Sequence, residues 1–409
     1  MSRLDELIQE YCPDGVNYRK LEDCCTVLDK KRKPVTKAAR EAGEYPYYGA
    51  NGIQDYVSDY IFDGTFVLVG EDGSVITKAG TPVVTWAEGK IWVNNHAHII
   101  EETDGVLLRY LFHYIQTIDV TPLIHGNIPK LTGGDFRALQ IPVPPLPVQS
   151  EIVRILDNFT ELTAELTAEL TARKKQYEYY RDKLLTCDDN IAVKRIGDIT
   201  RVFSASRVHK DEWTTEGVPF YRSSDVISYF NGVENSRGKA YISKELYEKL
   251  SAKSGKICKD DILITGGGTI GVPYIVPNDD PIYMKDADLL CIQHSKEFDS
   301  RYLYHYFLST LFRDYLKGIT HDATIPHYTI SQICETPVPL PTLDVQKRIV
   351  NVLDNFDAIC SDLKIGLPAE IEARQKQYEF YRDTLLTYAA TGKTILTDRQ
   401  TDRQTSIMR

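Results

Sequence analysis

The sequence predicts an α/β (α+β) protein with two similar globular domains, separated by a long antiparallel two-helix coiled coil and related as a pseudo-two-fold internal repeat. The main observation is a segment that occurs twice, because Gln149 to Phe159 returns at a constant offset as Gln346 to Phe356. Arg173 to Thr186 returns as Arg374 to Thr387, with four more residues in the second copy. Four residues is about one helical turn, so the same face still points inward. A duplicated unit implies two equivalent roles.

The blocks that precede the repeated helices also match. Arg109 to Tyr114 corresponds to Arg301 to Tyr306, and Tyr45 to Tyr48 corresponds to Val218 to Tyr221. The order along the chain is therefore globule, helix, globule, helix. The basic stretch Lys30 to Arg40 has no counterpart in the second copy. A shared framework with divergent loops suits two binding modules of separate specificity.

Proline-rich stretches mark where each repeated helix begins, since proline is tolerated in the first turn of a helix and disrupts its interior. The chain ends in a polar stretch that repeats the quartet Thr-Asp-Arg-Gln, which is typical of disorder. We therefore expect a first target domain at 1–141, a proline-rich segment and spacer helix at 142–187, a second target domain at 188–336, a second proline-rich segment and spacer helix at 337–388, and a disordered tail at 389–409.

Both predicted helices carry an apolar stripe. From Ser150 to Leu185 the apolar residues recur at spacings of three, four or seven, which is the pattern of a helix that buries one face. The second copy has the same stripe, is interrupted at Gly366 to Pro368 and resumes at Ile371. Because a whole globule lies between them in the chain, the two helices are expected to pack antiparallel and to bury each other.

The first helix contains tandem quartets, Thr163 to Leu166 and Thr167 to Leu170. One interpretation is a filler of good helix formers. The other is a ruler, because each added quartet lengthens a helix by ~6 Å and rotates its far end by ~40°, whereas one DNA base pair rises by ~3.4 Å.

Composition fits a protein of 409 residues with full hydrophobic cores, since 42% of the residues are hydrophobic. The sequence has no apolar run of ~18 residues and no secretory segment from Met1 to Ile8, so we expect a cytoplasmic protein. Eight scattered cysteines without a Cys-x-x-Cys pair predict buried free thiols. The net charge of −10 argues against indiscriminate coating of nucleic acid but permits local basic patches.

Motifs of catalysis and of metal or cofactor binding are weak. Gly266 to Gly271 has the spacing of a dinucleotide fingerprint, but the residues that follow predict a strand, so we interpret it as a turn. Gly392 to Thr394 lacks the earlier glycine of a phosphate-binding loop, because position 387 is Thr387. His96 and His98 suggest a packed or surface pair with no third metal ligand nearby, and His113 and His305 suggest core packing. We predict no catalytic residue and no metal site.

At this point the chain resembles the specificity subunit of a type I restriction-modification enzyme. The resemblance rests on Leu4 to Val16, the segments Pro142 to Pro144 and Pro337 to Pro339, the segments Leu156 to Phe159 and Leu353 to Phe356, Gly366 to Ile371, and the segments Lys175 to Asp182 and Lys376 to Asp383. It implies that each globule is a target recognition domain reading one half of a split sequence in double-stranded DNA. It also implies that the helices set the distance between the halves and bind two methyltransferase subunits, and that restriction subunits join the complex.

The same resemblance implies a non-catalytic chain, with S-adenosylmethionine, ATP and Mg on the partner subunits. The absence of an Asn/Asp-Pro-Pro-Tyr/Phe loop agrees with this, because a DNA methyltransferase needs it for the flipped base. Cationic and amide side chains are the expected DNA contacts. The DNA candidates are Lys30, Lys31, Arg32, Lys33, Lys37, Arg40 and Asn51 in the first domain, and Arg201, Arg207, Lys210, Arg222, Ser223 and Asp225 in the second. The partner-binding candidates are Tyr177, Tyr180, Arg181, Tyr378, Tyr381 and Arg382.

Two other functions are open at this level. The chain could be an interaction scaffold whose globules bind protein or glycan, in which case binding would be insensitive to salt. It could also be a self-contained methyltransferase or nuclease, in which case the purified chain would be active with cofactor.

Overall fold

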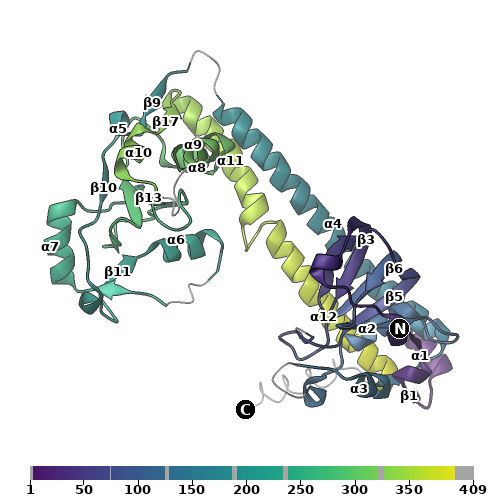
Figure 1. Ribbon diagram of the computed structural model, residues 1–409. Coiled ribbons are helices and arrows are strands. Elements are labelled where there is room, and N and C mark those ends of the chain that lie inside the picture. The colour runs from purple at the N-terminus through teal and green to yellow at the C-terminus, as the bar shows by residue number, and fades with distance from the viewer. Residues whose placement is uncertain are drawn as a thin grey trace, which may run out of the picture. The chain divides into compact units, whose positions relative to one another are not determined.

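The computed structural model describes residues 3–73, 75–124, 129–186, 191–233, 238–320 and 327–391 (Figure 1). The chain divides into two compact units. Unit 1 comprises residues 1–166 and 370–409, and unit 2 comprises residues 167–369. The boundary falls within the long helix α4 (Leu146–Leu185), so each unit contains one globular domain and part of this helix.

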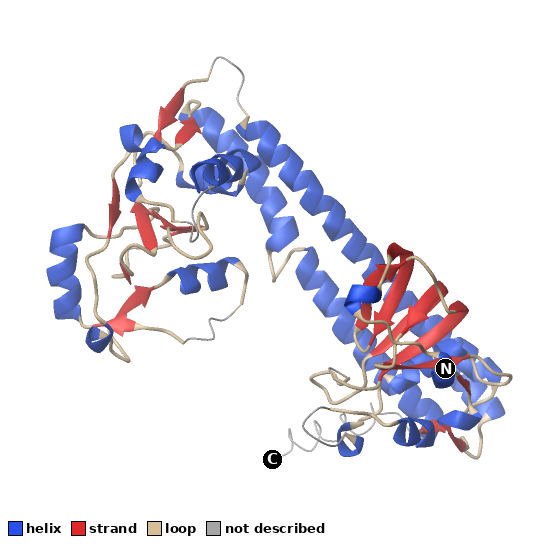
Figure 2. Ribbon diagram, in the orientation of Figure 1, coloured by secondary structure: helices blue, strands red, loops and turns tan. Residues whose placement is uncertain are grey.

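Unit 1 is built on a β-sheet, drawn in red in Figure 2. In the described residues this sheet has six strands in the order β2-β7-β5-β6-β3-β4. The strands are β2 (Thr26–Val27), β3 (Ala42–Gly49), β4 (Gly52–Val57), β5 (Phe62–Gly70), β6 (Val84–Val93) and β7 (Ala97–Glu101). Strands β3 and β6 run parallel, and the other neighbours are antiparallel. The end of β5 is buried on both faces, as its unbroken run of apolar residues predicts.

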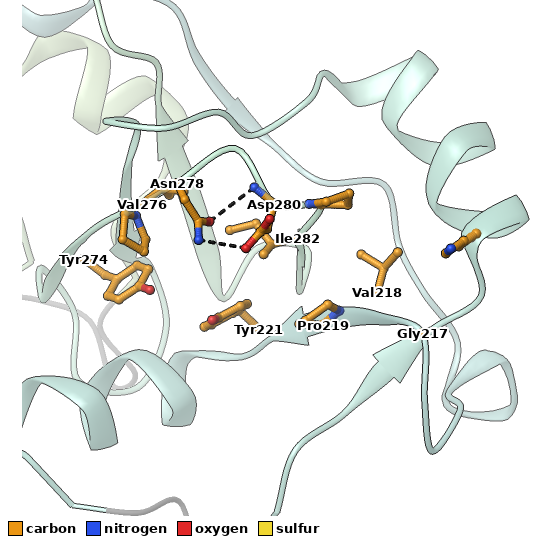
Figure 3. Close-up of a pocket in the computed structure, with 12 residues that line it drawn as sticks. Gly217, Val218, Pro219, Tyr221, Tyr274, Val276, Asn278, Asp280 and Ile282 are labelled. Carbon is orange, nitrogen blue, oxygen red and sulfur yellow. Dashed lines mark hydrogen bonds between the residues drawn. The ribbon is translucent and has the colours of Figure 1, made fainter.

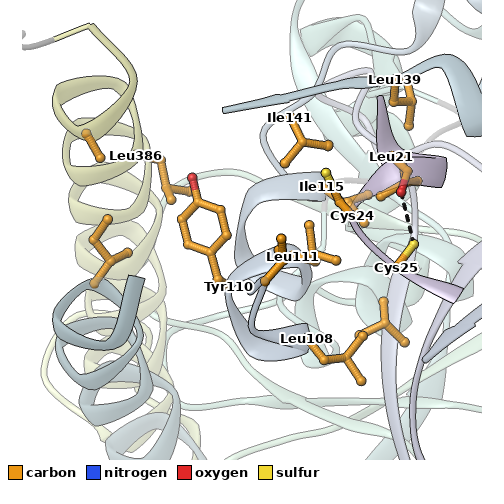
Figure 4. Close-up of a cluster of buried hydrophobic side chains, with 14 of the residues drawn as sticks. Leu21, Cys24, Cys25, Leu108, Tyr110, Leu111, Ile115, Leu139, Ile141 and Leu386 are labelled. Atoms are coloured by element: carbon orange, nitrogen blue, oxygen red, sulfur yellow. Dashed lines mark hydrogen bonds between the residues drawn. The ribbon is translucent and has the colours of Figure 1, made fainter. Parts of the chain in front are cut away.

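Helices cover this sheet and complete the core of unit 1. They are α1 (Arg3–Tyr11), α2 (Leu108–Ile115), α3 (Gly133–Ala138), the first half of α4, and α12 (Leu367–Thr391). A short antiparallel pair joins β1 (Tyr18–Lys20) to β8 (Gln140–Pro142). The core brings together Leu21, Tyr110 and Leu111 with Leu386 of α12 (Figure 4). The second copy of the repeated helix therefore contributes directly to the hydrophobic core of the first domain.

Unit 2 repeats this topology with shorter strands. In the described residues its sheets have the orders β10-β16-β13-β14 and β12-β11-β15, and β9 pairs with β17. The pairing of β13 with β16 matches that of β5 with β7, and the parallel pair β11-β15 matches β3-β6. The strands are β9 (Val193–Arg195), β10 (Val202–Ser204), β11 (Val218–Tyr221), β12 (Tyr241–Ile242), β13 (Ile262–Thr265), β14 (Pro273–Ile275), β15 (Tyr283–Met284), β16 (Leu289–Ile292) and β17 (Pro337–Pro339).

The long strand β6 thus corresponds to two short strands, β14 and β15. Pro277 and Pro281 lie between them, and proline cannot donate a hydrogen bond to a neighbouring strand. The helices of unit 2 are the second half of α4, α5 (Ile196–Ile199), α6 (Ser223–Phe230), α7 (Lys244–Ser254), α8 (Ser300–Leu308), α9 (Thr310–Thr320), α10 (Ile330–Glu335) and α11 (Leu343–Ser361). Helices α3 and α10 begin alike, because Thr132 and Thr329 each accept a hydrogen bond from the third residue of the helix.

The structure agrees with the predicted fold class, in which two similar domains are each followed by a helical segment. The predicted first spacer helix is α4, which begins at Leu146 and holds Pro147 in its first turn. The second copy is interrupted between α11 and α12, where Gly366 and Pro368 predicted a break. Within unit 2, α4 and α11 run antiparallel, because Tyr180 stacks on Phe356 while Lys174 lies near Cys360, further along α11.

Several local predictions can also be compared with the structure. Gly266 to Gly271 form a turn that leads into β14, as expected. Cys258 and Cys334 are only partly buried, contrary to the expectation of buried thiols, whereas the other free cysteines of the described residues are buried. Helix α12 continues to Thr391, past the predicted start of the tail, and residues 392–409, including Gly392 to Thr394, lie outside the described residues. Within the described ranges, no helix is both long and apolar enough to cross a membrane.

Candidate functional site

The repeated glutamines join each globule to its helix. Gln149 is fully buried, accepts a hydrogen bond from the backbone of Leu107 at 2.9 Å and donates to the carbonyl of Pro144 at 2.7 Å. Gln346 makes the equivalent bonds to Asp299 at 2.8 Å and Pro341 at 2.8 Å. An amide side chain satisfies a donor and an acceptor at once, which explains why glutamine occupies both positions.

Each unit also contains a cluster in which a buried histidine and a buried tyrosine meet a partly exposed aspartate and arginine. In unit 1, His113 lies 2.9 Å from both Tyr378 Oη and Asp157 Oδ1, and Arg109 donates to the same carboxylate at 2.7 Å. The tyrosine comes from α12, so the second copy of the repeat binds the domain of the first copy.

Unit 2 contains the same cluster with the copies exchanged. His305 lies 3.0 Å from Tyr177 Oη and 2.7 Å from Asp354 Oδ1, which also accepts from Arg301 Nε at 3.0 Å. Here the tyrosine comes from α4, in the first copy. The repeated Leu-Asp-Asn-Phe and Lys-Gln-Tyr-Glu segments therefore include the residues that attach each helix to a globule.

Burial sets the electrostatics of both clusters. Desolvation lowers the pKa of His113 and of His305. The neighbouring carboxylates act in the opposite direction, but their effect is smaller than that of desolvation. Burial alone would raise the pKa of Asp157 and of Asp354, but the hydrogen bonds and charges of histidine and arginine outweigh it and hold both pKa values below the usual range. The prediction of core packing for the two histidines is confirmed, since both side chains are fully buried.

The partner-binding candidates divide by exposure. Tyr177, Tyr378 and Arg181 are at most 7% exposed, because they pack inside their own units. Arg382 has a side chain that is 12% exposed and pairs with Asp383. Tyr180 and Tyr381 are 37% and 43% exposed. Their neighbours Tyr179 and Phe380, which belong to the same repeated segments but were not among the candidates, are exposed as well.

The basic stretch of unit 1 contains two kinds of cation. Lys30, Lys31, Lys33 and Lys37 are exposed, as is Asn51 in the turn between β3 and β4. Arg32 instead donates to Glu71 at 2.6 Å and to the carbonyl of Ala97 at 2.6 Å. Arg40 is bound to Asp55 at 3.2 Å and lies over the ring of Tyr47. The lysines are thus available to a ligand, whereas both arginines hold the loop in place.

Arg32 belongs to a polar network that the sequence did not predict. Asp29, Glu71 and His98 bring carboxylate and imidazole atoms within 4.8 Å of one another, as a metal site would require. Burial raises the pKa of Asp29, but the hydrogen bonds from His98 and Ile99 and the charges of His98 and Arg32 reverse this and lower it. Lys130 and Arg137 also reach these carboxylates. With three cationic side chains on two carboxylates, the geometry is that of an ion-pair network.

This network corrects the interpretation of the two nearby histidines. They do not form a pair in one environment, because His96 is exposed in the loop before β7, whereas His98 is buried within β7. His98 also has potential co-ligands that the sequence did not indicate, since Asp29 and Glu71 are distant in the chain and meet because β7 pairs with β2 on one side and with β5 on the other.

The candidates of unit 2 divide in the same way. Arg222 is 9% exposed and forms a two-point ion pair with Asp225, at 2.8 and 2.9 Å. Ser223 donates to the carbonyl of Asp288 at 2.7 Å. Arg201 is exposed but donates to the carbonyl of Ser254, and Arg207 and Lys210 are exposed. The side chains of Arg222, Ser223 and Asp225 are therefore committed to one another or to the backbone.

Each unit has a pocket of about 440 Å³. The pocket lies next to β6 in unit 1 and next to β15 in unit 2, and these are equivalent strands. In unit 2 it opens where β14 and β15 are interrupted, among prolines and beside Tyr221 and Tyr274 (Figure 3). In unit 1 it is more amide-rich. Its lining residues are Pro34, Val35, Thr36, Arg40, Tyr47, Gln54, Asn94, Asn95 and His96. Of these, only Arg40 was among the predicted DNA contacts, although Asn94 to His96 directly follow the buried apolar end of β6.

Comparison with known proteins identifies the family. The family model of the type I restriction modification DNA specificity domain matches residues 13–173 and 188–373. A putative type I restriction enzyme specificity subunit of Haemophilus influenzae is 37% identical over 385 residues, which cover 91% of this chain and 96% of that protein. The type I restriction enzyme EcoR124I/EcoR124II specificity subunit of Escherichia coli is 30% identical over 307 residues, or 70% of this chain and 72% of that protein.

A similar fold occurs in the crystal structure of the type I restriction-modification S subunit from M. genitalium. The TM-score is 0.51 at 16% sequence identity, with 93% of this chain and 98% of that chain covered. The two family matches fall on the two copies of the repeat, and each covers most of a globule and part of the helical segment that follows it. The chain therefore belongs to the family of type I restriction modification DNA specificity domain proteins.

Proposed function

We propose that the chain is the non-catalytic DNA-recognition subunit of a type I restriction-modification complex, and that each unit reads one half of a split target. The observation that carries this proposal is the match of the specificity-domain family to both copies of a duplicated fold. Two readers of equal topology and different loops suit a target made of two unlike half-sites.

On the DNA side, exposed cations supply affinity through the phosphates. Lys30, Lys31, Lys33 and Lys37 of unit 1 are free to do so, and Arg207 and Lys210 take this role in unit 2. Arg32 and Arg40 hold the loop that carries the unit 1 lysines, whereas Arg222 is bound to Asp225. Asn51 remains a base-contact candidate because it is exposed at the β3-β4 turn.

On the protein side, two modification subunits dock on the helices, at the exposed rings beside the buried anchors. These rings are Tyr179 and Tyr180 on α4, and Phe380 and Tyr381 on α12. Exposed aromatic side chains are favoured at protein interfaces. The modification subunits use S-adenosylmethionine to methylate adenine, and restriction subunits with ATP and Mg join the same complex in the cytoplasm.

The test is to co-express the chain with its modification subunits and to map modified adenines across a genome. We expect one motif made of two short half-sites with an unspecified gap. Purified complex should also lose DNA affinity steeply as salt rises, because phosphate contacts release counterions. A continuous motif, or salt-insensitive binding to a protein or glycan, would instead support the scaffold function, which the family assignment does not favour.

A further inference from the structure

We propose that Gln54 recognises an adenine in the half-site read by unit 1, and that Asn94 and Gly49 position its amide group. This inference rests on the proposed function. Gln54 lies on β4 and is exposed, whereas Asn94 is 2% exposed and follows β6. The Asn94 Nδ2 atom donates to Gln54 Oε1 at 3.2 Å.

Hydrogen-bond chemistry fixes which way the Gln54 amide faces. The backbone N–H of His96 donates to Asn94 at 2.8 Å, and since an N–H can only donate, the atom that receives it must be Oδ1. The other atom of the Asn94 amide is then Nδ2, which can only donate, so the Gln54 atom opposite it must be Oε1. In the described part of the chain, Gln54 Nε2 has no hydrogen-bond partner, and Oε1 retains one lone pair.

Gly49 provides the surface on which this amide lies. A Cβ atom added at Gly49 would overlap the Nε2 and Cδ atoms of Gln54. The side chain therefore lies across the glycine backbone, where every other residue type would displace it. An exposed glutamine that is held on two sides has lost much of its rotational freedom, which favours specific binding.

The surroundings favour a nucleic acid as the ligand. Gln54 and Asn94 line the 440 Å³ pocket of unit 1, and the segment Pro34 to Thr36 lines it as well. The exposed lysines Lys33 and Lys37 flank this segment on either side. Amide groups in a pocket, with exposed lysines beside one of its lining segments, match a base edge that is bordered by phosphates.

The equivalent loop of unit 2 carries a different chemistry. The backbone of Asn94 donates to Tyr48 at 3.1 Å, and the backbone of Lys285 donates to Tyr221 at 2.8 Å, so the two loops leave equivalent strands in the same way. In unit 2 the position of Asn94 is taken by Lys285, which forms an ion pair with Asp288 at 2.5 Å. Equivalent loops that carry different side chains are expected in two domains that recognise different half-sites.

Adenine is the base that fits the fixed amide. Its N7 accepts a hydrogen bond and its N6 amino group donates one, which matches the unpaired Nε2 and the remaining lone pair of Oε1. Guanine would instead place O6, a hydrogen-bond acceptor, opposite the acceptor Oε1 of Gln54. The bidentate pair predicts a preference for adenine of roughly 5- to 150-fold at one position of one half-site.

The experiment maps modified adenines, and measures binding to matched duplexes, for complexes assembled with variants of the full chain. Gln54→Ala should abolish the preference at a single position of one half-site, and Gln54→Glu should shift it towards cytosine, whose N4 amino group donates to a carboxylate. Gly49→Ala tests positioning, because it keeps the glutamine but displaces its amide. Gln140→Ala is the control, since it removes another exposed glutamine of unit 1, outside the pocket, and should leave the motif intact.

The outcomes separate this inference from the function on which it rests. A wild-type motif that is bipartite, together with an unchanged motif for Gln54→Ala and Gly49→Ala in folded complexes, would overturn the inference alone. A wild-type complex with no bipartite motif would overturn the proposed function. Relaxation at the same position in both variants, with the other half-site and the gap unchanged, would support the assignment of Gln54.

Discussion

Replacing Tyr378 with phenylalanine removes one hydrogen bond by which a helix of the second copy binds the domain of the first copy. Tyr378 is 5% exposed on α12, and its hydroxyl lies 2.9 Å from His113 Nδ1. The other ring nitrogen of His113, Nε2, carries the proton and donates a hydrogen bond to Asp157. Nδ1 therefore acts as the acceptor, and Tyr378→Phe leaves it buried without a partner.

The expected cost follows from that geometry. Leaving a buried polar atom unsatisfied costs about 1–3 kcal/mol. For a unit of this size, each kcal/mol lowers the melting temperature by roughly 2–4 °C. Tyr177→Phe removes the equivalent bond to His305 in unit 2 and should cost a similar amount. Because the two sites lie in separate units, their effects should be additive.

Urea and thermal unfolding of the purified chain provide the assay, and Tyr381→Phe is the matched control. Tyr381 is on the same helix, is 43% exposed and stacks on Phe159 at 5.2 Å, so its variant loses a hydroxyl but keeps the ring contact. We expect a change below about 0.5 kcal/mol for this control. If Tyr378→Phe were no more destabilising than Tyr381→Phe, the anchoring role of the crossed tyrosines would be refuted.

Three further predictions concern spacing, affinity and pH. Inserting one Thr-Ala-Glu-Leu quartet after Leu166 lengthens the continuous helix α4 by ~6 Å. Because one base pair rises by ~3.4 Å, the unread gap should widen by about one or two base pairs. Mapped motifs with an unchanged gap and intact half-sites would exclude the ruler. Neutralising the four exposed lysines Lys30, Lys31, Lys33 and Lys37 should weaken DNA binding regardless of sequence. In binding titrations over a salt series, the slope of log affinity against log salt concentration should become shallower by about 0.9 for each phosphate that is no longer neutralised. An unaltered slope would count against this surface. Burial lowers the pKa of His113 and of His305 below the ordinary value of 6.5. The unfolded chain therefore binds protons more readily than the folded chain, and the free energy of unfolding should fall as pH drops below 6.5. Unfolding curves recorded between neutral and mildly acidic pH measure this, and a free energy of unfolding that rose on acidification would contradict the prediction.

Repetition and periodicity made the architecture predictable. Helix α4 and the interruption before α12 follow from local signals, namely an apolar stripe and a Gly-x-Pro break. Parallel roles of Gln149 and Gln346, or of Asp157 and Asp354, follow once the copies are aligned. Which copy each tyrosine would contact was not predictable, because the crossing of Tyr177 and Tyr378 depends on tertiary packing.

The site was less predictable, for a physical reason. Arg32 and Lys33 are adjacent cations, yet only the arginine is bound by Glu71 and Ala97, which come from the end of β5 and the start of β7. Similarly, Gln54 and Asn94 are forty residues apart and meet only through the register of β3 with β4 and β6. Sequence patterns indicate which side chains are cationic, but pairing between strands decides which of them remain available to a ligand.

The most direct test of the central claim is an exchange of one reader. In a chimera, residues 191–336 are replaced by the corresponding region of the Haemophilus influenzae relative, and modified adenines are mapped for the assembled complex. If each unit reads one half-site, a single half of the motif should change while the other half and the gap stay as in the wild type. A folded, active chimera in which both halves change together would contradict independent reading by the two units.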